Sequence, residues 1–64
     1  MRPINPNMAV LGAVDIFGKI SETQMLQMYP DLTPRDIRTA AERLAGKYLT
    51  IDTSGSDVTY RKNW

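Results

Sequence analysis

The sequence predicts a mainly α-helical domain in which three helices are followed by a small β-hairpin. Two helix-start patterns, at Ser21 and Thr33, follow an apolar repeat of helical spacing near the N-terminus. After Gly46 the spacing of apolar residues changes from helical to alternating. The chain has 64 residues, and a domain of this size buries only roughly 60% of the surface of its unfolded chain. We therefore expect one small core with little room for an enclosed active site.

The composition argues against catalysis. The chain has no cysteine and no histidine, which removes disulfides, thiolate metal ligands and the usual near-neutral acid–base group. It also lacks a glycine-rich phosphate loop and a pair of carboxylates at a spacing typical of acid–base chemistry, so we expect no enzyme, cofactor or metal site. The longest mostly apolar run, Met8–Val14, is far shorter than the ~20 residues of a membrane-spanning helix. With no signal-peptide pattern either, we expect a cytoplasmic protein without a membrane partner.

The first six residues differ in character from the rest. They contain two prolines, which lack a backbone donor and disfavour a helix at the preceding residue. We expect an extended N-terminal arm of residues 1–6 and a single domain of residues 7–64. Arg2 in this arm either contacts a phosphate or only solvates a frayed terminus.

The first helix is predicted over Met8–Phe17, with Asn7 as its cap. Gly18 ends it, and the segment Gly18–Ile20 is either a linker or a short strand that pairs with the later hairpin. The residues expected on its core face, with Leu11 at the margin, are Val10, Ala13, Val14 and Phe17.

The second helix is predicted over Glu22–Met28. Ser21 and Gln24 have the spacing of a capping box, in which each side chain satisfies an exposed amide at the helix start. Pro30 stops this helix, and Tyr29–Leu32 forms the turn to the third helix. Its core-facing residues are expected to be Met25, Leu26 and Tyr29.

The third helix has the clearest boundaries. Thr33 caps it, Pro34 suits the first position, Asp36 lies near the positive helix end, and Gly46 ends it in a left-handed conformation. The expected core face consists of Ile37, Ala40, Ala41, Leu44 and Ala45. The opposite face consists of Arg35, Arg38, Thr39, Glu42 and Arg43, and three arginines with a threonine among them exceed what solubility requires.

The alternating apolar pattern of residues 47–62 predicts a β-hairpin. Its strands are Lys47–Ile51 and Val58–Lys62, joined by the polar, glycine-containing tip Asp52–Asp57. Trp64 is too large to remain fully in water without cost. It either packs on the first helix or the hairpin, or forms part of a dimer contact.

This order of elements resembles the winged helix-turn-helix superfamily, as found in small bacterial and phage regulators. The resemblance is strongest over Ile37–Ile51, IRTAAERLAGKYLTI, where a recognition helix runs through a glycine into the first wing strand. It implies a transcriptional regulator whose third helix enters the major groove of double-stranded DNA, with the hairpin as a wing along the backbone. By position, Arg35, Arg38, Thr39 and Arg43 would face the groove, and Thr33, Arg61 and Lys62 would contact phosphates.

The charge pattern keeps a second function open. The net charge is only +1, from 8 Lys and Arg against 7 Asp and Glu, and the wing tip carries Asp52 and Asp57. This favours the alternative of a winged-helix protein-interaction module that inhibits or adapts a host or replication protein. For DNA binding we expect a homodimer, because a lone module with few phosphate contacts binds weakly.

Arg38 separates a functional from a structural interpretation of the cationic face. In the structural interpretation Arg38 pairs with Glu42 one turn later on a solvated surface. In the functional one, Arg38→Ala leaves the melting temperature nearly unchanged and weakens the DNA complex.

Overall fold

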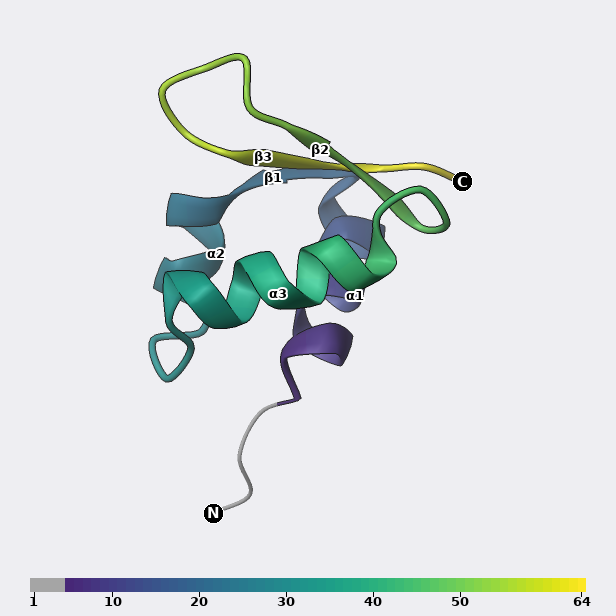
Figure 1. Cartoon of the computed structure of the whole chain (residues 1–64). Helices are drawn as coiled ribbons and strands as arrows, with labels where there is room; N and C mark the ends of the chain where they lie inside the picture. Colours follow the sequence, from purple (N-terminus) through teal and green to yellow (C-terminus); the bar gives the residue numbers. More distant parts are fainter. Residues whose placement is uncertain (1–4) are drawn as a thin grey trace.

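A computed structural model describes residues 5–64, which form three α-helices and a three-stranded antiparallel sheet (Figure 1). Residues 1–4, most of the expected arm, lie outside the described residues. The elements in chain order are α1 (Pro6–Phe17), β1 (Lys19–Ser21), α2 (Glu22–Met28), α3 (Pro34–Leu44), β2 (Leu49–Asp52) and β3 (Thr59–Lys62). The helices lie on one side of the sheet, and α3 crosses α1 (Figure 1).

Helix α1 begins two residues earlier than expected. Asn5, rather than Asn7, is the cap, and its side-chain oxygen accepts a hydrogen bond from the Asn7 N–H at 3.0 Å. Pro6 then occupies the first helical position, where its missing N–H costs nothing. Our expectation treated this proline only as a helix breaker. Gly18 ends the helix as predicted, with a φ of 73° that a glycine adopts without strain.

Strand β1 resolves the alternative left open at Gly18–Ile20. It pairs antiparallel with β3, placing Ile20 opposite Tyr60, and the sheet has the strand order β1-β3-β2. The fold is therefore mixed α and β, with more sheet than the predicted hairpin. Strand β2 also starts later than expected, because residues 46–48 form a turn in which the Tyr48 N–H donates to the Leu44 carbonyl at 2.9 Å.

Helices α2 and α3 follow their local signals. The Ser21 hydroxyl accepts from the Gln24 N–H at 3.1 Å, and α2 has the predicted bounds. At the start of α3, the Thr33 hydroxyl accepts from the Asp36 N–H at 3.2 Å while the Asp36 carboxylate accepts from the Thr33 N–H at 3.1 Å. Helix α3 ends at Leu44, and Gly46 follows with a φ of 85°. This left-handed residue confirms the predicted end of the helix.

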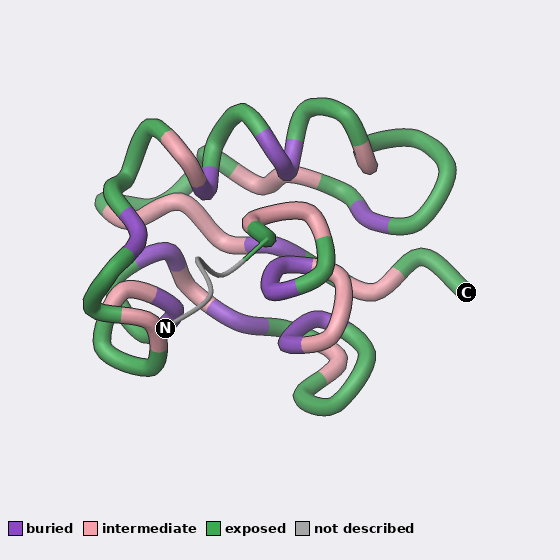
Figure 2. The backbone as a smooth tube through the Cα atoms, turned by 90° about the horizontal axis from the view of Figure 1, so that it is seen from below, coloured by how far each residue is buried: buried purple, intermediate pink, exposed green. Residues whose placement is uncertain are grey.

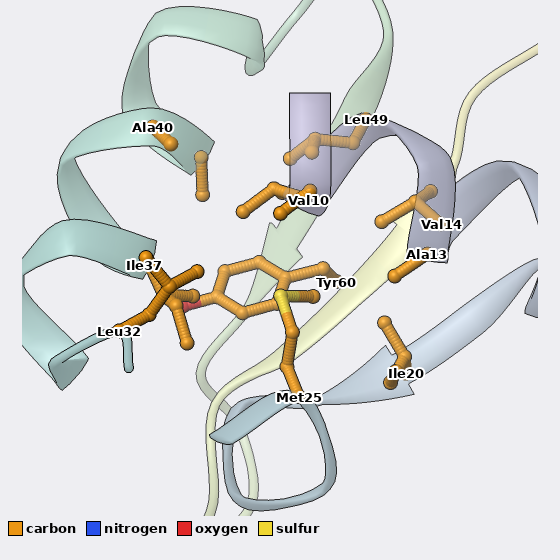
Figure 3. Close-up of a cluster of buried hydrophobic side chains, with 12 residues drawn as sticks. Val10, Ala13, Val14, Ile20, Met25, Leu32, Ile37, Ala40, Leu49 and Tyr60 are labelled. Atoms are coloured by element: carbon orange, nitrogen blue, oxygen red, sulfur yellow. The ribbon is translucent and has the colours of Figure 1, made fainter. Parts of the chain in front are cut away.

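The core surrounds the ring of Tyr60, which lies between Ile37 of α3, Val10 of α1 and Met25 of α2 (Figure 3). Buried segments gather toward the middle of the molecule and exposed ones around the outside (Figure 2). The buried apolar residues are Ala9, Val10, Ala13, Val14, Ile20, Met25, Leu32, Ile37, Ala40, Ala41, Leu49 and Tyr60.

The core face of α3 is as predicted except at its end. Ile37, Ala40 and Ala41 are buried and Leu44 is partly buried, but Ala45 is exposed. Ala45 is exposed because the helix has already ended there, with Ala45 in an extended conformation. The alanines of α3 and of α1 let the two helices pack closely where they cross. Among the described residues, none of the helices is both long and apolar enough to span a bilayer.

Candidate nucleic-acid interface

Three of the predicted DNA-contacting residues form one exposed row on α3. Arg35, Thr39 and Arg43 are spaced four residues apart, so they follow each other along one side of the helix. All three line a polar hollow of about 430 Å³ together with the cap Asn5 and the first two residues of α1, Pro6 and Asn7. We call these three residues the α3 row.

The charge around the α3 row favours an anion. Two arginines face the hollow, and the first turn of α1, which also lines it, contains no acidic residue. The positive end of the α1 dipole therefore adds to the arginine charge. Asp36 is the acidic residue of the lining, and its carboxylate is already bound to the Thr33 N–H. Thr33 itself is exposed at the start of α3.

Arg38 lies apart from the α3 row and is held by Glu22 of α2. Its Nε donates to Oε1 at 2.8 Å and its Nη2 to Oε2 at 3.1 Å, a two-bonded arrangement that fixes the planar guanidinium. Glu22 is buried, whereas the Arg38 side chain is 59% exposed. Arg38 thus pairs across helices rather than with Glu42, and removing it would leave a buried carboxylate without its partner. This geometry predicts, contrary to the expectation from the sequence, that Arg38→Ala lowers the melting temperature.

The hydroxyl of Tyr60 lies near this ion pair. It is buried and has no hydrogen-bond partner among residues 5–64. Burial, and secondly the negative charge of Glu22, raise the pKa of Tyr60 from 10.0 to about 12, while the charge of Arg38 opposes the shift. Tyr60 also lines a hollow of about 230 Å³ between α3 and the hairpin, with Arg38 and Glu42 at its rim. Tyr60 is thus a core residue, and its ring is not exposed for stacking on a base.

The raised pKa of Tyr60 predicts an alkaline loss of stability. The unfolded chain releases this proton near pH 10 and the folded protein only near pH 12, so the stabilisation is complete below pH 10 and is lost across that window. Tyr60→Phe should remove this part of the alkaline decline, while its stability near neutral pH stays equal or rises because the hydroxyl has no partner. Urea unfolding of both proteins at a series of pH values measures this. Equal declines would contradict the shift.

Arg61 and Lys62, the two residues predicted to lie on a wing, point to different sides. Arg61 is exposed and lies 3.5 Å from the Asp52 carboxylate. The Lys62 ammonium donates to Asp15 of α1 at 2.9 Å and lies 4.9 Å from the centre of the Trp64 ring. Arg61 alternates with the buried Tyr60 and so faces away from the helices. The structure therefore does not gather Arg61 and Lys62 with the α3 row into one patch.

The hairpin tip begins with an ordered turn. Asp52 accepts from the Ser54 N–H at 2.9 Å and from the Ser54 hydroxyl at 2.6 Å. These two hydrogen bonds, more than the charge of Arg61, lower the pKa of Asp52. The acidic side of the tip thus stays negative, which does not favour a phosphate contact there.

Local sequence patterns identified the α3 row but missed the Glu22–Arg38 pair. Glu22 and Arg38 are 16 residues apart and belong to different helices, so no spacing rule connects them. Glu22 is unusual only as a charged residue on a short helix, which is no signal of burial. Among residues 5–64, no three side chains of histidine, cysteine, aspartate or glutamate are grouped so as to hold a metal ion.

No family model, curated protein or solved structure matches the chain. The function is therefore inferred from the geometry and charge of the chain's own surfaces.

Proposed function

We propose that the chain is a winged helix-turn-helix domain that binds double-stranded DNA through the α3 row and acts as a small transcriptional regulator. The layout supports this: α2 and α3 are joined by a short turn, and a hairpin follows α3 directly. The hairpin is extended by β1 into a sheet that the helices cover on one side. A helix-turn-helix places its second helix in the major groove of DNA. In this chain that second helix would be α3.

The observation that carries the proposal is the α3 row itself. Arg35 and Arg43 are exposed, and none of the ion pairs found among residues 5–64 includes either of them. Eight residues of helix separate them by about 12 Å along the axis, comparable to the width of the major groove. Arginine can bond a guanine edge with two hydrogen bonds, and threonine between them can meet a base or a phosphate.

Arg38, Arg61 and Lys62 have a smaller part in this proposal. Arg38 is bound to Glu22, Arg61 to Asp52 and Lys62 to Asp15. Each would have to leave a carboxylate before it could neutralise a phosphate. Thr33 keeps the role of a phosphate contact only through its exposed position at the start of α3, because its hydroxyl and its N–H are both used in hydrogen bonds with Asp36.

A titration with a short mixed-sequence duplex tests DNA binding. We expect the amide NMR signals of residues 33–43 to shift at low salt and to recover as salt is added, because phosphate contacts release counterions. Arg35→Ala and Arg43→Ala should each weaken binding about tenfold or more and reduce the salt dependence by roughly one contact.

The matched control is Arg61→Ala, the same substitution at an exposed arginine away from α3. It should weaken binding much less than either substitution in the α3 row. No shift at low salt, or an equal loss with Arg61→Ala, would contradict the proposal. Binding to a protein through an apolar surface would respond little to salt, so the same titration distinguishes the alternative of a protein-interaction module.

A further inference from the structure

Helix α1 leaves an apolar surface uncovered. Six large apolar side chains are exposed among residues 5–64, and three of them, Met8, Ile16 and Phe17, belong to α1. Met8 is 72% and Ile16 77% exposed. Two more, Tyr48 and Trp64, lie across a groove from α1. Exposed apolar side chains that are grouped rather than scattered are typical of interaction sites.

The groove beside α1 has a volume of about 560 Å³ and is mostly apolar. One wall consists of Met8, Leu11, Gly12 and Asp15 of α1, and the other of Tyr48, Trp64 and the stem of Lys47. Tyr48 and Trp64 hold each other edge to face, with ring centres 6.3 Å apart. The one acidic group of the lining, Asp15, is already paired with Lys62. Covering this surface would therefore leave no carboxylate of the groove unpaired.

Gly12, in the middle of α1, is not explained by the packing of a single chain. A Cβ atom built there meets no atom within 4 Å, so a larger residue would fit. Glycine inside a helix is less favourable than alanine, because it loses more backbone freedom on folding. A glycine at this position allows the backbone of another helix to approach α1 closely.

Met8, Gly12 and Ile16 form a ridge along α1, each four residues from the next, with the glycine at its centre. We propose that this ridge is the interface of a homodimer in which the α1 helices of two copies cross antiparallel at Gly12. Met8 of each copy then packs against Ile16 of the other. The interface between two identical chains must be self-complementary, and a ridge with a large apolar residue at equal distances on both sides of a glycine meets this condition. Ridges of this spacing pack into each other's grooves in many helix pairs.

Met8 and Ile16 belong to the ridge, Tyr48 and Trp64 lie across the groove from it, and all four side chains are at least 45% exposed. The α3 row lines a different hollow from the groove beside α1. The inference is independent of DNA binding.

Sedimentation equilibrium without DNA, from micromolar to millimolar protein, tests the dimer. We expect the mass to approach twice 7.2 kDa. Met8→Glu and Ile16→Lys should each raise the dissociation constant at least tenfold, and both charges suit the dipole of α1, so the monomer should remain folded. The matched control is Met28→Lys, an exposed methionine near the end of α2, which should leave the dissociation constant unchanged. A monomer at all concentrations, or equal weakening by Met28→Lys, would overturn the proposal.

Gly12→Gln adds a test with two opposite readouts. The side chain has space in the single chain and favours a helix, so the circular dichroism of a dilute sample should show equal or greater helix content. The same variant should lose dimerisation, because the second helix can no longer approach. A Gly12→Gln protein that dimerises like the wild type would overturn the crossing at Gly12.

The antiparallel arrangement has its own signature. Met8 and Ile16 are about 12 Å apart along one helix, too far for a nuclear Overhauser effect within a single copy. In a mixture of isotope-labelled and unlabelled protein, we expect such an effect between the Met8 and Ile16 methyl groups of different copies. A dimeric sample without it would overturn this arrangement.

Discussion

Replacing Ile37 with alanine is expected to remove a large part of the free energy that stabilises the fold. The side chain is fully buried and lies beside the Tyr60 ring (Figure 3). Its truncation removes apolar contacts and leaves a cavity, which costs about 2–5 kcal/mol in a well-packed core. A domain of 64 residues has a total stability of roughly 3–10 kcal/mol. The substitution therefore removes much of what holds the chain folded.

Urea unfolding followed by circular dichroism measures this loss. Thr39→Ala is the matched control, because Thr39 lies on the exposed side of the same helix and should change stability by less than about 0.5 kcal/mol. If Ile37→Ala cost no more than this control, Ile37 would not be a core residue and the packing of α3 against the sheet would be wrong.

Breaking the pair between Glu22 and Arg38 should have the next largest effect. Arg38→Met keeps the aliphatic stem but leaves the buried Glu22 carboxylate without a partner. An unsatisfied buried group of this kind should lower the melting temperature by about 5–10 °C in a domain of this size. Arg35→Met, the same change at an arginine without an ion pair among the described residues, should lower it far less. Thermal scans at neutral pH measure both.

A double-mutant cycle shows that the effect belongs to the pair. Glu22→Gln removes the buried charge, so in its presence Arg38→Met should cost less than it does alone. Additive losses would mean that Arg38 stabilises the fold through other contacts. Loss of DNA binding by an Arg38 variant would in either case require a check of folding before it is assigned to the interface.

The parts of the fold that sequence predicted well are those with local causes. The bounds of α2, and the start of α3 at Pro34, follow from capping side chains within three residues of the amides they satisfy. The start of α1 was wrong because Asn5 and Asn7 are both able to cap, and only the position of Pro6 distinguishes them. Strand β1 was left open because its three residues are too few for an alternating pattern to show.

The sequence predicted only those parts of the candidate site that depend on the spacing of residues within one helix. Helical spacing placed Arg35, Thr39 and Arg43 on one exposed side of α3. Spacing could not reveal that Arg38, one turn from Arg35, meets a buried carboxylate on another helix, nor that Asp52 and Asp15 hold Arg61 and Lys62. Those pairs depend on how the elements pack, which the periodicity of a single element does not contain.

The position of β3 has a consequence for the order in which the chain folds. This strand is the last element among residues 5–64, yet it lies between β1 and β2 and hydrogen-bonds to both. The Lys62 N–H even reaches back to the Gly18 carbonyl at 2.6 Å. During synthesis, β1 therefore has no strand to pair with until residues 59–62 have left the ribosome. Contacts between residues this distant in sequence form late. We therefore expect the apolar faces of the three helices to stay exposed to solvent until β3 completes the core.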